Sequence, residues 1–582
     1  MIARSARAVC ASALLVCSCS LGTSAPSSKA CAAPSPDGAS KVDASYSWDA
    51  VVKPGSKPPP VSVVTQHNDN ARTGVNPAET CLVPSVVPSL VQRASFHVDG
   101  LVFAQPLLLA GSRYLLIVAT SANQLAAFDL STLSTTPVWQ LGQETFGIPG
   151  TVEPGPGPLG ILSTPVIDPS TNRLYLVARS CASTTTTSGC PQTVHVIDAT
   201  SGKHLDSVVA AGAFTDADGG VHPFDPDTQM NRPALLLQGG QLVAAWGVMT
   251  ALPGKRHEED VVYHGIVMSF DVANLHAPPL FYVDTPNGCG AGIWQAGGGL
   301  AGDGQAVYFE SGNLTLGVGV SPTTPLDFPA TPRDQENSIV RLQWSGTLPV
   351  VGSYFDSRPY HSDGNVFQYT NRYDYDLSSS GAALVPDSNL IVAGSKGGIV
   401  YTVDRTTMQQ TQTPISAFHR QALPAGQTLY IAANDAGPEM LGSPVVWRRT
   451  AGTDDALIYF WPRSEYLTSL RYQHSNNTTS VATTSADTAG PGGGFLSLTW
   501  NGATPSSAVL WAAVSLGNGS GTEASFIRAY DPQTLQRLWQ GAVPGYAKFG
   551  VPTIAAGRVF VPSWSSSGGS NVVVYATPSC GG

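Results

Sequence analysis

The chain has 582 residues, of which 42% are apolar and only 12% are charged, and its formal net charge is −10. No cluster of five or more Lys and Arg residues occurs, which argues against nucleic acid or an anionic membrane face as a partner. A chain of this length exceeds one ordinary compact domain unless that domain is built from repeats.

The N-terminus is typical of an export signal. An apolar run from Ala8 to Val16 follows two arginines and is too short to span a bilayer. The stretch Val-Cys-Ser-Cys that ends at Cys19 is similar to a bacterial lipobox, in which the final cysteine is lipidated after cleavage. We therefore predict a signal peptide at 1–18 and a periplasmic or cell-surface lipoprotein whose membrane contact is the lipid on Cys19. Cleavage near Ala25 or Ala33, giving a secreted protein, is the alternative.

Residues 19–60 are rich in Ala, Ser, Pro, Lys and Gly, a composition that cannot bury a core and predicts a disordered tether. Six cysteines remain if Cys19 carries lipid, an even number that suits an oxidising compartment. Cys181 and Cys190 flank a short polar loop, and we expect a disulfide between them. The remaining four cysteines can pair in three ways, which the sequence does not separate: Cys31, Cys81, Cys289 and Cys580. No Cys-x-x-Cys pair occurs, so a zinc or redox cluster is disfavoured.

Beyond the tether, short apolar strands recur that end in aspartate. Their last residues are Asp129, Asp198, Asp271, Asp404 and Asp531. The last two gaps are close to twice the first two, which indicates a period of about 66 residues with degenerate copies near 337–344 and 466–472. Long helical periodicity is missing after the signal, and strands of this composition favour an all-β fold.

A second sequence pattern, used below as a marker of the inner strands, recurs with the same period. At eight places Pro or Gly follows a small or polar residue and precedes another apolar strand. These are Pro106, Pro165, Pro233, Gly299, Gly381, Pro444, Gly494 and Pro552. Eight units of three or four strands predict a single eight-bladed β-propeller over 61–582. The eighth unit lacks an outer strand, and we expect the N-terminal segment 61–100 to supply it from 92–100 and so close the ring. Seven blades with an irregular segment is the alternative.

The strand end at 529–539 resembles the docking motif of quinoprotein-type propellers. Asp531, Thr534 and Trp539 match that motif in spacing, while Leu535 stands where glycine is usual. In that family the tryptophan packs against the neighbouring blade, and the aspartate and threonine brace the turn. The resemblance therefore implies a structural role for these residues.

Longer stretches, among them 160–179 and 285–299, look like exported bacterial proteins with quinoprotein-like propellers. The resemblance covers roughly 100–576 and implies the quinoprotein-like form of the eight-bladed fold. The wider family holds pyrroloquinoline quinone (PQQ) dehydrogenases as well as non-catalytic scaffold proteins. Fold alone therefore does not settle the function.

A quinoprotein dehydrogenase is expected to hold calcium through Glu and Asn oxygens and to need a carboxylate base. The stretch Phe-Glu-Ser-Gly-Asn offers Glu310 and Asn313 as candidate metal ligands, although a strand end followed by a turn explains the same residues. No third ligand or base can be assigned from spacing. The adjacent Cys-Cys pair that many members place over the quinone is missing after the signal.

Other polar residues are candidate cofactor contacts. Trp294 and Gln295 lie among glycines, which permit a close backbone approach at a ligand or at a crowded axis. Lys396 lies in a tight turn that does not have the pattern of a phosphate loop. The segment 66–74, which contains several polar side chains, is expected to be buried, hydrogen-bonded and able to cover one mouth of the channel.

Two main functions remain open at this stage, and a glycan-active hydrolase with paired carboxylates in a funnel is a weaker third. The first is a monomeric, exported binding or scaffold module for a protein or glycan, with its ligand at a propeller face. The alternative is a periplasmic or extracellular oxidoreductase that uses PQQ and calcium in the axial channel. The missing cysteine pair and the incomplete docking motifs favour the first.

Overall fold

The structure is a computed structural model in which Met1–Lys53 and Pro54–Gly582 form separate units, and only the second unit is described. The predicted signal peptide, Cys19, the tether up to residue 57, and Cys289 lie outside the described residues. The described ranges are 58–151, 157–186, 188–248, 263–288, 290–313, 334–345, 348–357, 376–415, 438–449, 455–517, 524–564 and 569–580.

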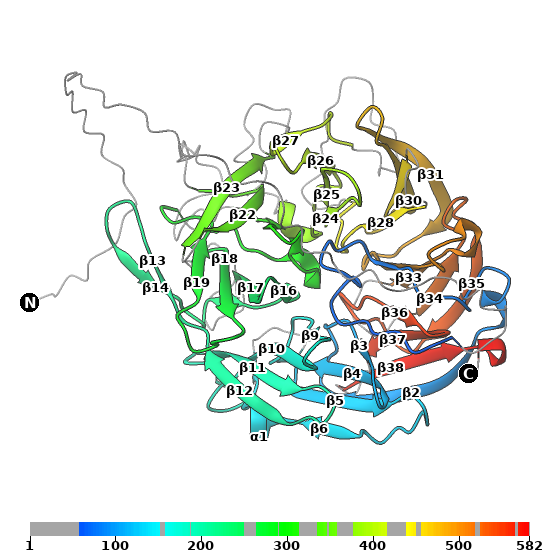
Figure 1. Cartoon of the computed structure of the whole chain (residues 1–582), viewed down its shortest axis with the longest axis horizontal. Helices are drawn as coiled ribbons and strands as arrows, with labels where there is room; N and C mark the ends of the chain where they lie inside the picture. The colour runs from blue at the N-terminus through cyan, green and yellow to red at the C-terminus, as the bar shows by residue number, and fades with distance from the viewer. Residues whose placement is uncertain are drawn as a thin grey trace, which may run out of the picture. The chain divides into compact units, whose positions relative to one another are not determined.

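The second unit is an eight-bladed β-propeller (Figure 1), in which each blade is an antiparallel sheet with its first strand innermost. Blade 1 contains β3 (Leu107–Ala110), β4 (Tyr114–Thr120), β5 (Gln124–Asp129) and β6 (Trp139–Leu141). Blade 2 contains β9 (Val166–Asp168), β10 (Arg173–Arg179), β11 (Gln192–Asp198) and β12 (His204–Val209). Blade 3 contains β16 (Leu236–Gln238), β17 (Gln241–Val248), β18 (Ile266–Asp271) and β19 (Leu280–Val283), with β15 (Gln229–Met230) beside β17.

The next blades follow in chain order. Blade 4 contains β20 (Ala301–Gly302), β21 (Ala306–Glu310), β22 (Ser338–Ser345) and β23 (Leu348–Asp356). Blade 5 contains β24 (Ala383–Leu384), β25 (Leu390–Gly394), β26 (Val400–Asp404) and β27 (Gln409–Gln410). Blade 6 contains β28 (Val445–Arg448), β29 (Asp455–Phe460), β30 (Tyr466–Gln473) and β31 (Thr478–Thr488). Blade 7 contains β32 (Gly494–Thr499), β33 (Val509–Ser515), β34 (Ser525–Tyr530) and β35 (Arg537–Val543), with β1 (Val75–Asn76) parallel to β32.

Blade 8 joins the two ends of the chain. It contains β36 (Thr553–Ala555), β37 (Arg558–Trp564) and β38 (Gly569–Ala576), and its outer strand is β2 (Val91–Asp99) from the N-terminal segment. The predicted eight-bladed fold with N-terminal closure is therefore confirmed, and the seven-bladed alternative is wrong. The two degenerate repeat copies are β22 and β30, the third strands of blades 4 and 6.

Few other elements occur in the described residues. They are α1 (Gln143–Phe146), the strand pair β7 (Gly150–Thr151) and β8 (Pro158–Leu159), the hairpin β13 (Ala213–Thr215) and β14 (Val221–Pro223), and the short 3₁₀ turns Val87–Ser89, Gln295–Gly297, Leu377–Ser379, Pro505–Ser507 and Pro578–Cys580. Of the helices in these ranges, none has the length and apolarity needed to cross a membrane.

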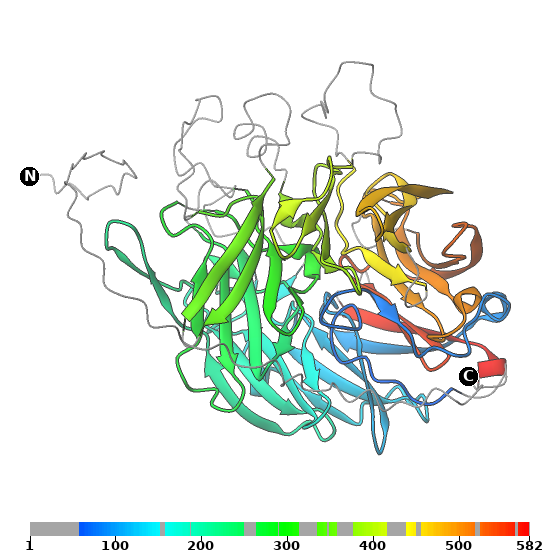
Figure 2. The ribbon, with the colours of Figure 1, turned by 45° about the horizontal axis from the view of Figure 1, so that its top comes forward.

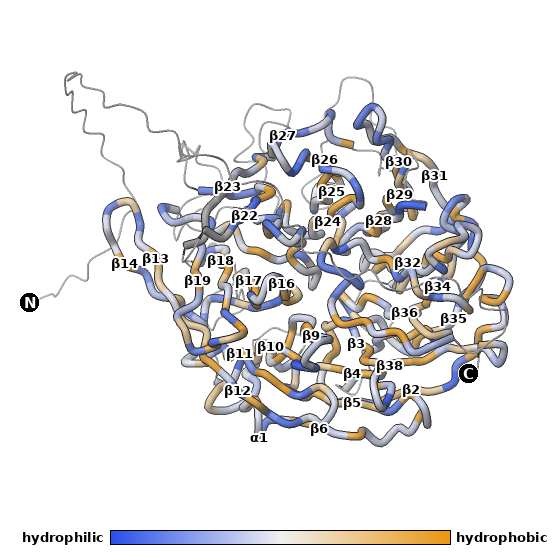
Figure 3. The backbone as a smooth tube through the Cα atoms, in the orientation of Figure 1, coloured by the Kyte–Doolittle hydropathy of each residue, from blue (hydrophilic) through white to orange (hydrophobic). Residues whose placement is uncertain are grey.

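The apolar strands form eight separate cores, one in each seam between neighbouring blades. Because the middle strands of a blade face another blade on both sides, their residues are almost all buried, as in β17 and β33. Figure 3 shows the resulting hydrophobic stretches along β3 and β4. This two-sided burial explains why these strands read as continuous apolar runs instead of alternating ones.

Residues 63–76, here called the N-terminal strap, run past the inner strands of all eight blades. Backbone or asparagine groups of the strap bond in turn to the backbone of one residue in each blade. In blade order these residues are Leu108, Ile167, Leu237, Gly302, Leu384, Val446, Leu498 and Ile554. The strap is buried over most of its length, as the sequence suggested for 66–74, and it fills the centre of the ring.

A second apolar group, here called the axial plug, closes the axis where the chain enters the inner strands. Its residues come from five blades, which can meet only near the axis: Phe103, Leu162, Ala296, Phe495 and Phe549. Phe549 makes aromatic contacts with Phe103 and Phe495 at centroid distances of 6.5 and 6.1 Å. The loops around this plug form one face of the propeller. Figure 2 shows the ring of blades turned by 45° from the view of Figure 1.

Two disulfides lie in the described residues. Cys81 is joined to Cys580, which resolves one of the pairings that the sequence left open. Cys181 is joined to Cys190 across the loop between β10 and β11, the pair that the sequence suggested.

Candidate functional site

The five residues singled out as cofactor or metal contacts lie close together on the plug face of blades 4 and 5. Trp294 and Gln295 lie between β19 and β20, Glu310 ends β21, Asn313 follows it, and Lys396 follows β25. The Gln295 side-chain oxygen accepts a hydrogen bond from the Glu310 amide at 3.1 Å. These positions follow from the fold, because strand ends and blade connections meet at the same end of each sheet.

Asp376 connects the remaining residues and was missed by the sequence analysis. Its Oδ1 accepts from the Asn313 amide at 3.0 Å, and its Oδ2 accepts from Lys396 Nζ at 3.3 Å. The signal that could have identified Asp376 is its position five residues before the inner-strand marker Gly381. An acidic residue there is placed at the axis by the blade connection.

The two candidate metal ligands are engaged by different partners. Glu310 Oε2 accepts from the Gly381 amide at 3.1 Å, while Asn313 Oδ1 accepts from Asn337 Nδ2 at 2.8 Å. Within the described ranges, no three His, Cys, Asp or Glu side chains gather closely enough to hold a metal ion. Calcium usually takes six to eight oxygen ligands, so these residues alone do not form a calcium cage.

Burial also affects the protonation of the Glu310 carboxyl group. Glu310 is fully buried, and desolvation raises its pKa well above the usual value, although the amides of Gly381 and Ser380 oppose that rise. Its Oε1 has no hydrogen-bond partner. Burial alone therefore favours the neutral form of the Glu310 carboxyl group.

A second buried carboxyl group lies nearby and was also missed. Asp284, directly after β19, is fully buried, and neither carboxylate oxygen has a hydrogen-bond partner. Desolvation raises its pKa well above the usual value, the Tyr282 hydroxyl opposes that rise, and the charge of Glu336 adds to it. No short sequence pattern marks Asp284, because its burial comes from the packing of blades 3 and 4.

The Trp294 ring is already covered by a cation. The Arg232 guanidinium carbon lies 4.7 Å from the centroid of Trp294 and 4.8 Å from that of Phe549 in the axial plug. A planar quinone cannot stack on the ring face that Arg232 occupies. The observed residues therefore do not provide the apolar platform expected of a PQQ site, and we derive no reaction step through the quinone.

Four cationic side chains gather on the plug, and we call them the axial cation group: Arg232, Lys396, Arg463 and Lys548. Lys548 Nζ lies 5.0 Å from the Phe549 ring centroid. Its side chain is accessible to solvent, yet the surrounding protein desolvates it, and this together with the charges of the other three lowers its pKa to about 8. Asp376 and Glu439 neutralise part of this charge through ion pairs with Lys396 and Arg463.

No protein-family model matches the chain, and neither does any curated protein. Solved structures show the fold. A quinohemoprotein alcohol dehydrogenase from Pseudomonas putida has a TM-score of 0.57 at 11% identity, covering 89% of this chain and 80% of that one. The enzyme of the same kind from Comamonas testosteroni has a TM-score of 0.54 at 13% identity with the same coverage.

A europium-containing methanol dehydrogenase has a TM-score of 0.52 at 12% identity, covering 89% of this chain and 98% of that one. At such low identities these likenesses concern architecture and not chemistry. This chain is therefore a quinoprotein-like eight-bladed β-propeller.

Proposed function

We propose that this protein is a binding or scaffold module for a protein or glycan, and that its axial cation group takes a carboxylate-bearing partner. The observation that carries the proposal is Arg232, held between the rings of Trp294 and Phe549 with Lys548 beside it. Arg232 is thus held between two rings on an apolar base. Such an arrangement favours binding of an anion, because little side-chain freedom remains to be lost.

Electrostatics supports an anionic ligand. The chain as a whole has a formal net charge of −10, whereas four cations and two paired carboxylates meet on the axial plug. Desolvation lowers the pKa of Lys548, and the positive charges of Arg232, Arg463 and Lys396 lower it further. A bound carboxylate would offset these positive charges and raise the pKa of Lys548 towards its ordinary value.

Export of this module is part of the proposal. A signal peptide at 1–18 and lipidation of Cys19 would deliver the propeller to the periplasm or the cell surface. The two disulfides support this location, since such bonds persist in oxidising compartments. Metabolic labelling with a fatty acid, in the wild type and in Cys19→Ser, tests the anchor.

The alternative function is a PQQ- and calcium-dependent oxidoreductase in the axial channel. Two observations favour it: the likeness to solved dehydrogenases in fold, and a set of cations that would also suit the carboxylates of a quinone. The contacts of Glu310 and the covered face of Trp294 weigh against it.

The two functions are separated by titration of the purified full-length protein. We expect an oligogalacturonate or a glutamate-rich peptide to bind in a calorimeter, and a neutral oligosaccharide not to bind. Lys548→Gln should weaken binding about tenfold, as expected for loss of one charge-assisted contact. Lys203→Gln, on an exposed turn of blade 2, is the matched control and should leave binding unchanged.

PQQ with calcium forms the opposing arm of the experiment. Specific binding, detected as a shifted quinone absorbance and a raised melting temperature, together with no response to acidic ligands, would overturn the proposal in favour of the oxidoreductase.

A further inference from the structure

Two blades carry a tryptophan at the same register of their outer strand. Trp139 in β6 pairs with Ala127, and Trp539 in β35 pairs with Ala529, so each lies opposite the residue two positions before the terminal aspartate. Each ring reaches the following blade. Trp139 lies against Gly202 of blade 2, and Trp539 contacts Tyr575 of blade 8 at a centroid distance of 5.1 Å.

Blade 2 has no tryptophan at this register. Its outer strand β12 places Asp206 opposite Val196, which is the corresponding position. On the facing blade, Leu275 stands four residues after Asp271, as Gly202 stands four residues after Asp198. The Asp206 side chain has only four heavy atoms and stays partly exposed. It therefore occupies the position at which an indole fills the seam between blades 1 and 2.

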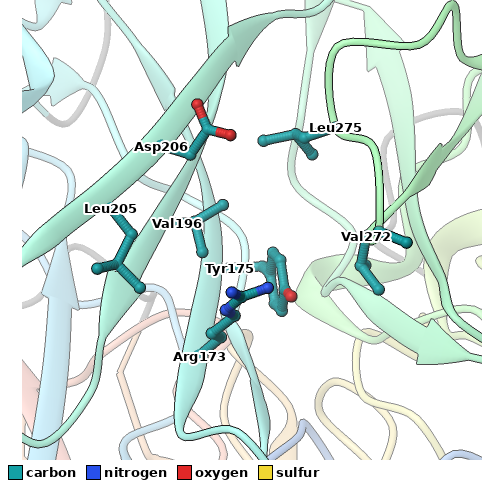
Figure 4. A pocket seen from close by; sticks show the side chains of 8 residues that line it. Arg173, Tyr175, Val196, Leu205, Asp206, Val272 and Leu275 are labelled. Atoms are coloured by element: carbon teal, nitrogen blue, oxygen red, sulfur yellow. The ribbon is translucent and has the colours of Figure 1, made fainter.

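A cavity of about 240 Å³ lies at this point of the seam. Figure 4 shows its side chains around an open centre, with Leu205 and Asp206 on one side and Val272 and Leu275 on the other. Val196, Tyr175 and Arg173 from blade 2 complete the wall, together with Ala273. An apolar cavity of about 150 Å³ is enough to bind benzene, so this larger one admits a bicyclic ring.

The polar groups of the wall suit an indole. Asp206 Oδ1 accepts from His276 Nε2 at 3.0 Å and from the Ser207 amide at 2.8 Å, and its other oxygen remains for a further donor. A ring N–H is such a donor. Arg173 lies beside the cavity with a planar guanidinium group, which stacks favourably on aromatic faces.

We propose that this cavity, here called the seam pocket, binds the tryptophan side chain of a partner polypeptide. The strand register indicates an indole as the ligand, because blades 1 and 7 fill the equivalent position with their own indole. The neighbouring strand indicates that this ring belongs to a polypeptide. β12 is the outermost strand of blade 2, and it exposes Leu205, which lines the pocket, by 42%.

An extended segment could pair with β12 while its tryptophan enters the pocket, and a flanking apolar residue would then cover Leu205. The seam pocket lies between blades 2 and 3 and shares no residue with the axial cation group. The proposal therefore stands independently of the function proposed above.

The test is binding of an acetylated, amidated heptapeptide with one central tryptophan in an otherwise Val/Thr sequence, followed by calorimetry and NMR on the full chain. The same peptide with alanine in place of tryptophan is the ligand control. We expect the tryptophan peptide to bind at least tenfold more tightly than the alanine peptide and more tightly than free indole.

Asp206→Trp fills the pocket from inside and should raise the melting temperature while it weakens peptide binding at least tenfold. Val209→Trp, which adds the same ring on the same strand outside the pocket, is the matched control and should leave the melting temperature unchanged. Should Asp206→Trp not fold, Val272→Phe narrows the pocket from blade 3 and gives the same test.

Two outcomes would overturn the proposal. Equal affinity for the tryptophan and alanine peptides would show that the pocket does not select the ring. Binding of free indole with exclusion of the peptide would assign the pocket to a small molecule instead of a partner chain.

Discussion

At the scale of single residues, the aspartate that ends the third strand of a blade organises the turn after it. Its Oδ1 accepts the amides of the second and third residues that follow, at Asp198, Asp404 and Asp531 alike. The fourth residue then has a positive φ, which is 73° at Gly202 and 55° at Leu535. Leu535 thus keeps the backbone of the glycine it replaces, and the burial of its side chain offsets the strain.

Gly202→Ala tests how closely this turn is fitted to the preceding blade. An added Cβ would lie 2.7 Å from Trp139 Cδ2 and would also occupy a left-handed backbone. We expect a loss of about 2–4 kcal/mol in the free energy of unfolding, measured by denaturant titration. Gly240→Ala has a similar φ of 76° with no atom near the new Cβ, and should lose about 1 kcal/mol. Equal losses would show that contact with Trp139 is unimportant.

His67 gives the strap a pH dependence with a defined sign. Desolvation lowers its pKa to about 4, while the unfolded chain titrates near 6.5. Between pH 6.5 and 4 the unfolded state therefore binds a proton that the folded state does not, and acidification favours unfolding. Stability contributed by neutral His67 is complete above pH 6.5 and falls by about 3 kcal/mol towards pH 4.

His67→Asn should flatten the pH profile of stability by this amount, since asparagine tolerates the positive φ of 56° at this position. The check is a set of denaturant titrations between pH 4 and 7. His97→Asn replaces a side chain that is 62% exposed and is expected to leave the profile unchanged. A profile in His67→Asn as steep as in the wild type would contradict the assignment.

At the scale of elements, the sequence predicted the local repeat and the closure by 92–100, but it missed most other contacts between distant residues. The eight inner strands begin at or within three residues after the markers Pro106 to Pro552, because each marker and its strand are neighbours in sequence. The contacts of the strap correspond to no local pattern in the sequence. Arg72, for example, donates to the carbonyl of Leu300, 228 residues away. The link from Asp376 to Asn313 spans 63 residues and was likewise invisible.

The two disulfides differ in the length of chain that they close, so their contributions to stability can be compared. Cys81–Cys580 encloses 499 residues of sequence separation, and Cys181–Cys190 encloses nine. In the chain-entropy account, the longer loop stabilises more, so removing Cys81–Cys580 with two serines should lower the free energy of unfolding by roughly 3 kcal/mol more than removing Cys181–Cys190. Denaturation midpoints of the two double variants provide the measurement, and a larger loss for Cys181–Cys190 would contradict it.

At the scale of the whole molecule, the ring is closed by the segment that precedes blade 1. The strap touches all eight blades, β2 completes blade 8, and Cys81 is bonded to Cys580. The contacts of β2 and Cys81 join residues several hundred positions apart, and they cannot form before the last blade exists. Such distant pairing makes closure a late and slow step of folding.

Removal of residues 1–100 should therefore abolish cooperative folding, whereas removal of residues 1–53 should not, because the propeller unit begins at Pro54. The longer deletion strips β38 of its partner β2, exposes the core around Phe96, which is fully buried, and takes the strap out of the ring. Thermal unfolding followed by near-ultraviolet circular dichroism should show a sharp transition for the shorter deletion and a broad or missing one for the longer. Adding a synthetic peptide of residues 58–100 should restore the transition, since it supplies both the strap and the strand. If residues 101–582 unfold with the same sharp transition and midpoint as the full chain, the N-terminal segment is not needed for closure of the ring, and the prediction is wrong.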